Sequence, residues 1–595
     1  MKQFLKFTLA SLVGTLLSLL IVFFILSGII ASIASLADKK VVQVEDNSFL
    51  HIKLDKPIPE RTPKSPFSDF SFSNIGGFDV KNIIGLNDIK KQIERAKTDD
   101  KIQGIYLDLS VIPARMATVE SIRNGLKDFK TSKKKVYAYA DIMSQKAYYI
   151  ASLADEVYLN PVAMMDFRGM SMNVMFFKGL LEKLDVDMQV IRYGEYKSAV
   201  EPFLLDHMSE ANKEQSLTYI AGIWKHMLKG IKEEREVGQE QLNNIADSIL
   251  LRKPEDALAY GLIDDILYKD ELYDIMRQEA DISEKKEPEF IAIEKYNKAA
   301  GANEIDVSVN KKSQVAVVYA LGEIRMGEGD NEIIGSDGIS EEIRKVRKDT
   351  AVKAIVLRVN SPGGSGVASD IIWREMVLAQ KEKPVIVSMG DLAASGGYYI
   401  ACPADKIYAQ PNTLTGSIGV FGIFPNIKGL LNNKLGITVD GVKTNEHADL
   451  GFFHRSLSKF ERDVLQENVD HFYLDFVNKV AEGREMTVEQ VKEIGSGRIW
   501  SGIDAIDIGL IDEFGGLNEA VQYAAEMAEI EEYKVKEYPR MKGPFDDLFN
   551  NMGMNMRAKA LKNQLGGSYR YFEYLKSAGE LETIQARLPF VYEIH

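Results

Sequence analysis

The stretch that decides the fold is "MGDLAASGGYYIACPADKIYAQP", residues 389–411, because the chain contains a second version of it. That version is "DIMSQKAYYIASLADEVYLNP", residues 141–161. Both contain the run Tyr-Tyr-Ile-Ala, which begins at Tyr148 and again at Tyr398, an offset of 398 − 148 = 250. Self-similarity maintained at a fixed distance indicates an internal duplication.

The duplication predicts two homologous domains, residues 46–300 and residues 310–540. In each, helical patterns alternate with short apolar runs rich in β-branched residues, such as "AIVLRV" at 354–359. Such alternation predicts an α/β fold with a mostly parallel sheet. The polar, lysine-rich stretch 284–313 is the predicted connector, and residues 541–595 form a C-terminal extension to which the sequence assigns no role.

The N-terminal segment predicts a membrane anchor. Residues 7–37 carry no charged side chain and are long enough to cross about 30 Å of hydrocarbon as a helix. We therefore expect residues 1–38 to form a short cytoplasmic tail and a single-pass transmembrane helix. Lys2 and Lys6 precede the span and favour a cytoplasmic N-terminus, which places the body on the outer side. Small residues near Ala34 leave cleavage of the segment as an alternative.

The composition argues against several classes of function. The chain has 73 basic and 87 acidic residues, a net charge of −14, and no basic cluster, so nucleic acid is not an expected partner. Its single cysteine, Cys402, lies in an apolar run and is expected to be a small buried residue. No phosphate-binding loop, HExxH motif or clustered Cys/His spacing occurs, so neither a metal nor a cofactor is predicted.

The two copies differ at the positions that carry reactive or permissive residues. The second copy has a serine and three glycines where the first does not, whereas the first copy has Lys197 where the second has His447. Each copy therefore keeps what the other lacks, which points to one shared site. The residues specific to the second copy, with their counterparts in the first, are Ser395 (Gln145), Gly396 (Lys146), Gly363 (Pro113) and Gly364 (Ala114).

These residue types suit nucleophilic catalysis by a serine. A serine hydroxyl needs a base, and a lysine amine can serve once burial lowers its pKa from about 10.4 toward neutrality. We therefore predict Ser395 as the nucleophile and Lys197 as the general base. Ser417, in "LTGSIGV", is expected to position the lysine amine by a hydrogen bond. His447 remains an alternative base because it occupies the position equivalent to Lys197.

Acyl transfer also requires donors for the oxyanion of the tetrahedral intermediate. Gly363 and Gly364 follow Pro362 and allow a substrate to approach the backbone closely, while Gly396 directly follows the predicted nucleophile. We expect these three glycines to form the oxyanion region. Ser361 and Ser365 are rival nucleophiles, but they lie within the glycine turn itself and are expected to serve it.

These motifs resemble those of a known family. The N-terminal anchor, the tandem duplication, "YGEYKSAVEPF" at 193–203, "NSPGGS" at 360–365 and "TLTGSIGVFG" at 413–422 are similar to the long form of the bacterial signal peptide peptidase A (protease IV) family. The resemblance covers nearly the whole chain. It implies a ClpP/crotonase-like fold in each copy and a Ser-Lys dyad split between them.

The resemblance further implies a homotetramer on the outer face of the bacterial cytoplasmic membrane that degrades signal peptides and other apolar peptides. Two rival functions stay open at this point. One is acyl-CoA chemistry on a crotonase-like scaffold, which does not explain a lysine retained opposite a serine. The other is a non-enzymatic membrane scaffold, which predicts no loss of activity when Ser395 is changed. Whether Lys197 reaches Ser395 within one chain or between chains is also open.

Overall fold

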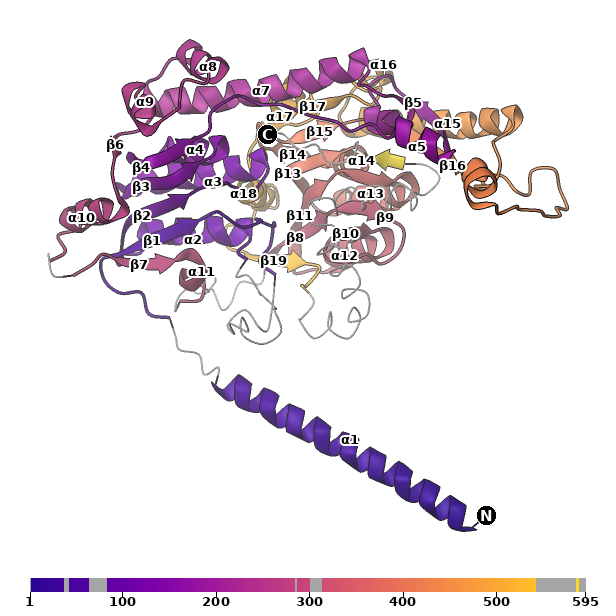
Figure 1. The fold of residues 1–595 in the computed structure, drawn as a ribbon, viewed down its shortest axis with the longest axis horizontal. Coiled ribbons are helices and arrows are strands. Elements are labelled where there is room, and N and C mark those ends of the chain that lie inside the picture. The colour runs from indigo at the N-terminus through magenta and orange to yellow at the C-terminus, as the bar shows by residue number, and fades with distance from the viewer. Residues whose placement is uncertain are drawn as a thin grey trace.

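The computed structural model describes residues 2–36, 42–63, 83–283, 286–299, 313–541 and 585–587. Its first element, α1 (Lys2–Leu36), lies apart from the rest of the fold in Figure 1. The window Lys6–Phe24 in this helix has a mean hydropathy of 2.4 and is not buried against the protein. The helix is therefore long and apolar enough to cross a membrane, although residues 37–38 of the predicted segment lie outside the described residues.

The first copy of the duplication folds around a six-stranded sheet in the order β6-β4-β3-β2-β1-β7. Every neighbouring pair in this sheet is parallel. The strands are β1 (Ser48–Lys53), β2 (Ile102–Leu109), β3 (Lys135–Met143), β4 (Glu156–Met165), β6 (Asp265–Ile266) and β7 (Glu289–Ala292). The helices are α2 (Leu86–Thr98), α3 (Met116–Phe129), α4 (Gln145–Ala151), α5 (Lys178–Leu184), α6 (Glu201–Leu204), α7 (Glu210–Arg235), α8 (Gln239–Asp247), α9 (Pro254–Ala259), α10 (Lys269–Glu279) and α11 (Ile293–Tyr296).

The second copy repeats this plan in an eight-stranded sheet. The strands are β8 (Gln314–Leu321), β11 (Val352–Ser361), β13 (Val385–Ala394), β14 (Lys406–Ala409), β15 (Leu414–Gly416), β17 (Ile499–Ser501), β18 (Glu513–Phe514) and β19 (Lys534–Tyr538). The helices are α12 (Ser336–Lys348), α13 (Gly366–Gln380), α14 (Gly396–Ala401), α15 (Lys459–Gly483), α16 (Val488–Ile494), α17 (Gly502–Asp507) and α18 (Leu517–Met527). Helices α2 and α12 begin 336 − 86 = 250 residues apart, so the duplication and the α/β fold class predicted from the sequence are confirmed.

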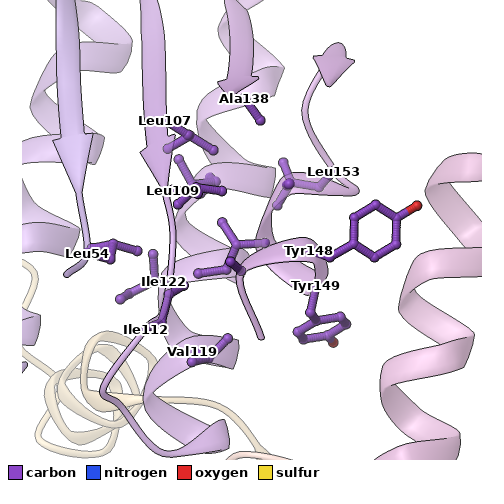
Figure 2. Close-up of a cluster of buried hydrophobic side chains, with 14 of the residues drawn as sticks. Leu54, Leu107, Leu109, Ile112, Val119, Ile122, Ala138, Tyr148, Tyr149 and Leu153 are labelled. Atoms are coloured by element: carbon purple, nitrogen blue, oxygen red, sulfur yellow. The ribbon is translucent and has the colours of Figure 1, made fainter. Parts of the chain in front are cut away.

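The apolar periodicity of the first copy produces a core between its sheet and helices α3 and α4, shown in Figure 2. Val119 and Ile122 are three positions apart on α3 and present one buried face to Leu107 and Leu109 of β2. Full burial of such side chains contributes about 1.5–3 kcal/mol each. This core holds helices α3 and α4 against the sheet of the first copy.

The two copies share a second, smaller sheet in the order β10-β9-β12-β20-β16-β5. Strand β5 (Asp187–Tyr193) comes from the first copy and pairs antiparallel with β16 (Val420–Asn426) of the second. The remaining strands are β9 (Glu323–Arg325), β10 (Ile333–Gly335), β12 (Gly363–Ser365) and β20 (Gln585–Arg587). The β5–β16 pairing therefore places a strand of the first copy against the second copy. Lys197 follows shortly after the end of this strand.

Buried polar contacts further join the copies. The Glu60 carboxylate accepts hydrogen bonds from the Arg358 guanidinium at 2.9 and 3.1 Å, and both side chains are almost fully buried. Helix α7 extends from the first copy over the second in Figure 1, where its Gln215 accepts a hydrogen bond from the Ile499 amide at 3.2 Å. The two copies are thus joined by the Glu60–Arg358 ion pair and by the contact between α7 and Ile499.

The connector predicted at 284–313 is partly wrong. Its segment Glu289–Ala292 is β7, which pairs in parallel with β1 at the edge of the first sheet, and α11 follows it. The apolar residues Phe290 and Ile291 within the polar stretch explain this, because a sheet edge needs only a short apolar strand. Residues 300–312 lie outside the described residues, and the domain boundaries stay a prediction.

Candidate active site

Ser395 lies in the turn between β13 and α14, as its place in the glycine-rich motif suggests. Its side chain is fully buried, and its backbone has φ 56° and ψ −116°. Its amide donates to the Gly416 carbonyl at 2.7 Å, which holds this uncommon conformation in place. A non-glycine residue in such a region costs of order 1–3 kcal/mol, and such residues cluster at active sites. In the first copy, the counterpart Gln145 is instead the first residue of α4, and the residue before it, Ser144, has φ −71° and ordinary extended backbone.

Lys197 follows β5 and comes from the first copy. The Tyr196 amide donates to the Ser496 carbonyl at 3.0 Å, and Gln215 of α7 donates to the Tyr196 carbonyl at 3.0 Å. Gly497 of the second copy packs so closely that a Cβ on it would fall 2.7 Å from Lys197 Cβ. The lysine backbone is therefore held by segments of both copies, and its side chain is completely buried.

The lysine amine and the serine hydroxyl are in direct contact. Lys197 Nζ lies 2.7 Å from Ser395 Oγ, 3.0 Å from Ser417 Oγ and 3.1 Å from the Ser417 carbonyl oxygen. Burial lowers the pKa of Lys197 well below its ordinary value, because a charged amine in this position loses its hydration. A neutral amine can donate two hydrogen bonds to Ser417 and direct its lone pair at the Ser395 hydroxyl.

Ser417 lies where the sequence places it, beside the lysine amine. Its own hydroxyl lies 3.3 Å from the Gly497 carbonyl and can donate to it, which leaves an oxygen lone pair for the amine. Its amide donates to the Arg498 carbonyl at 2.7 Å. Ser417 thus fixes the direction of the amine through both its hydroxyl and its carbonyl.

The glycines expected to bind the oxyanion also meet at this point. Gly363 has φ +94°, and a Cβ on it would fall 2.7 Å from the Gly396 amide nitrogen. A Cβ on Gly364 would overlap the Ile324 carbonyl oxygen at 2.0 Å. The Gly363 amide donates to Ser361 Oγ at 3.1 Å, so Gly363 contributes space, and the amides of Gly364 and Gly396 remain the expected donors.

The rival residues have other partners. Ser361 accepts from Gly363, and Ser365 caps α13 by accepting from the Ala368 amide at 3.4 Å. His447 lies 3.1 Å from a Glu461 carboxylate oxygen through its Nδ1 and is about one-third exposed. Cys402 is buried, and burial raises the pKa of its thiol to about 12. Among the described residues, no cluster of three or more His, Cys, Asp or Glu side chains is arranged to hold a metal ion.

Sequence reasoning missed the residues that frame the site. Gly497 supports both Lys197 and Ser417, and Glu323 and Ile324 of β9 flank the glycine turn. The glycine-rich phrase "GSGR" at 495–498 was the available signal for the first of these. No local signal marked β20, because its position depends on pairing with strands more than 150 residues away.

The chain is also similar in sequence to known proteins. The sequence model described as peptidase family S49 matches residues 128–283 and 378–531, once in each copy. "Protease 4" of Salmonella typhi is 36% identical over 482 residues, covering 80% of this chain and 77% of the relative. "Protease 4" of Haemophilus influenzae is 36% identical over 498 residues, covering 82% and 80%.

More distant similarities extend the comparison. "Serine protease SPPA, chloroplastic" of Arabidopsis thaliana is 32% identical over 455 residues, covering 75% of this chain and 66% of the relative. Among solved structures, a ClpP1 mutant from Listeria monocytogenes aligns with 34% of this chain and 94% of its own, at 16% identity and a TM-score of 0.24.

Proposed function

Because this chain belongs to peptidase family S49 and is a serine peptidase, we propose that Ser395 is its nucleophile and Lys197 its general base. The observation that carries the proposal is the 2.7 Å contact between Lys197 Nζ and Ser395 Oγ in a fully buried setting. Burial lowers the pKa of Lys197 and so favours the neutral amine, which is the form that can take a proton. In this proposal the first copy supplies the base, the second copy supplies the nucleophile, and the two form one catalytic site.

The reaction follows from this arrangement. Ser395 Oγ attacks the carbonyl carbon of the scissile bond while its proton moves to Lys197 Nζ. The resulting oxyanion faces the amides of Gly364 and Gly396. Lys197 then gives the proton to the departing amine, which leaves an ester on Ser395. Water attacks the ester while Lys197 takes one of its protons, and the bond between Ser395 Oγ and the acyl carbon then breaks. Lys197 returns the proton to Ser395 Oγ, which releases the carboxylic product and restores the serine hydroxyl.

The substrate is an extended peptide with apolar side chains, and signal peptides are its physiological class. The relatives' printed names, protease and serine protease, support a peptide substrate. A desolvated lysine requires surroundings that exclude water, and these favour apolar side chains in a substrate. Acyl-CoA chemistry remains a weaker candidate, because nothing in it requires the buried Lys197–Ser395 contact.

The protein is anchored by α1 in the bacterial cytoplasmic membrane, with both copies on the outer side. The apolar window Lys6–Phe24 supports the anchor, and the lysines before it support the orientation. The resemblance to the family supports a homotetramer. Protection of the folded body from protease added on the outer side would contradict the orientation, and a monomeric sedimentation mass would contradict the tetramer.

The dyad is tested with Ser395→Ala and Lys197→Met in the full-length protein. Both should abolish hydrolysis of a leucine- and alanine-rich fluorogenic peptide, while circular dichroism stays unchanged. Lys146→Met is the matched control, because Lys146 is another lysine of the first copy whose pKa burial lowers, but its amine donates to the Ala114 carbonyl and not to Ser395. Near-normal turnover by Lys197→Met would refute the base assignment. A preference for highly charged peptides would refute the substrate class.

A further inference from the structure

The side-chain amide of Gln215 joins the loop that carries Lys197 to the second copy. Gln215 lies on α7 and is 1% exposed. Its Nε2 donates to the Tyr196 carbonyl at 3.0 Å and to Ser198 Oγ at 3.2 Å, while its Oε1 accepts from the Ile499 amide at 3.2 Å. One buried side chain thus contacts the residues on both sides of Lys197 and a strand of the second copy.

The strand that Gln215 contacts lies beside the predicted nucleophile. Ile499 is the first residue of β17, where it is paired with Gly416 of β15. The Gly416 carbonyl accepts the hydrogen bond from the Ser395 amide at 2.7 Å, and Ser417 follows it in the chain. The Gln215 amide is therefore hydrogen-bonded to the strand pair that holds Ser395 and Ser417.

Lys197 itself lies between regular elements. It follows β5 and precedes the short 3-10 helix Ser198–Val200, with φ −75° and ψ 73°, values that belong to neither a helix nor a strand. The place of its amine therefore depends on how the neighbouring residues are held. A misplacement of about 1 Å at a reacting group can cost about 100-fold in rate. Hydrogen bonds on either side of Lys197 thus bear directly on the proton transfer.

The neighbouring ion pair does not replace this restraint. Glu214, the residue before Gln215, accepts from Arg498 at 2.7 Å, and the Arg498 guanidinium lies 4.8 Å from the centre of the Tyr196 ring. The Glu214 side chain is 49% exposed, and exposed ion pairs contribute little because water competes with them. Removal of the buried amide, by contrast, takes an acceptor away from the Ile499 amide where water does not replace it, which is costly.

We propose that Gln215 is a positioning residue that holds Lys197 Nζ against Ser395 Oγ by tying the lysine loop to β17. This inference rests on the proposed roles of Ser395 and Lys197. Gln215 does not touch the reacting atoms and acts through Tyr196 and Ser198. When its amide is removed, the loop loses this link to the second copy, the Nζ to Oγ distance lengthens, and water reaches the amine.

A loosened loop has a signature in the pH dependence. Burial is the cause of the lowered pKa of Lys197, and no charged side chain adds to it among the described residues. Of the charged groups on the elements around the loop, Glu214 and Arg498 pair with each other, and Glu201 of α6 accepts hydrogen bonds from the start of α7. Hydration of the amine therefore raises the pKa of Lys197 toward its ordinary value. The midpoint of the kcat profile then moves to higher pH, whereas partial unfolding alone would not move it.

The test compares wild-type full-length protein with Gln215→Met, which keeps the length of the side chain and removes its polar atoms. Both kcat and KM for a leucine- and alanine-rich fluorogenic peptide are measured across pH. We expect kcat at neutral pH to fall about tenfold or more, KM to stay within about twofold, and the midpoint to rise by about one pH unit. Ser198→Ala removes one acceptor of the Gln215 amide and should move the midpoint the same way by less. This second variant decides the question if Gln215→Met folds poorly.

Gln92→Met is the matched control. Gln92 is also a fully buried glutamine of the first copy, but its Nε2 donates to Asn297 Oδ1 at 2.9 Å. This variant should unfold at a lower urea concentration and keep the wild-type kcat and midpoint. A shift of the midpoint in Gln92→Met as large as in Gln215→Met would overturn the positioning role, because any buried glutamine would then have the same effect.

Lys197→Met separates this inference from the function on which it rests. If Lys197→Met is inactive while Gln215→Met keeps the wild-type kcat and midpoint, the positioning role is overturned and the proposed function stands. If Lys197→Met keeps near-normal turnover, the proposed function itself is overturned. A loss in Gln215→Met that lies in KM, with an unchanged midpoint, would also overturn the positioning role, because Gln215 would then act on substrate binding.

Discussion

Replacement of Gly363 by alanine tests the oxyanion region without touching the dyad. At φ +94°, alanine adopts the left-handed backbone region at a cost of about 1–2 kcal/mol. Its Cβ would also fall 2.7 Å from the Gly396 amide nitrogen and 3.0 Å from the Ala394 carbonyl oxygen. Both are backbone atoms that border Ser395, so relief of the clash must displace the predicted oxyanion donor. Loss of one such donor typically lowers kcat by about 10²–10³, or about 2.7–4 kcal/mol.

Gly327→Ala separates this effect from backbone strain. Gly327 has φ +92°, but a Cβ on it would meet nothing within 4 Å. Hydrolysis of a fluorogenic peptide and urea denaturation should be measured for both variants. We expect kcat/KM of Gly363→Ala to fall at least 100-fold below that of Gly327→Ala. If the two variants stay within about threefold of each other in kcat/KM, the glycine turn has no part in binding the oxyanion.

Three further substitutions or conditions probe the groups around the dyad. The folded-state pKa of Lys197 lies below its unfolded value. We therefore expect kcat to rise with pH through that lowered pKa and to level off below the pKa of an ordinary lysine. A flat pH–rate profile would contradict a titrating amine. Ser417→Ala should reduce kcat about tenfold with little change in KM, since the Ser417 carbonyl still holds the amine at 3.1 Å; complete inactivation would show a larger role for the hydroxyl. His447→Ala should leave kcat within about twofold of wild type, because its partner is Glu461, and a loss above tenfold would revive the histidine as a base.

The same lysine has a consequence for stability. Between its lowered pKa and the unfolded value, the folded protein binds fewer protons than the unfolded chain, so the contribution of this group to stability rises with pH. Lys197→Met removes a buried amine and should make unfolding in urea less dependent on pH over that interval. An unchanged pH dependence would indicate that the amine is not desolvated in the folded state.

The sequence predicted those parts of the protein that are encoded locally or by repetition. The offset of 250 residues aligned α2 with α12 and revealed that Ser395 and Lys197 are each retained in only one copy. Where two copies of one chain are alike around a position but differ at it, the difference points to a function for that residue. A lone serine or lysine gives no such indication. The prediction that Ser417 positions the lysine amine came from its motif, "LTGSIGV", in which a hydroxyl lies beside a glycine turn.

The remaining features depend on long-range pairing and could not be read locally. The contact between Lys197 and Ser395 requires β5 of the first copy to pair with β16 of the second, and no periodicity specifies that partner. The Gly363 amide donates a hydrogen bond to Ser361 Oγ, so Gly363 is not an expected oxyanion donor, and this depends on the detailed geometry of the turn. The polar surroundings of β7 concealed a short edge strand, whereas β20 lay in a segment with no resemblance to either copy.

The most direct test of the account is reaction of the full-length protein with a fluorophosphonate, which modifies activated serine hydroxyls, followed by peptide mapping. The account predicts one adduct, on Ser395, in the wild-type protein, and loss of that adduct in Lys197→Met, with Lys146→Met labelled like wild type. An adduct on Ser361 or Ser365 instead, or undiminished labelling of Ser395 in Lys197→Met, would contradict the claim that a buried lysine from one copy activates a serine from the other.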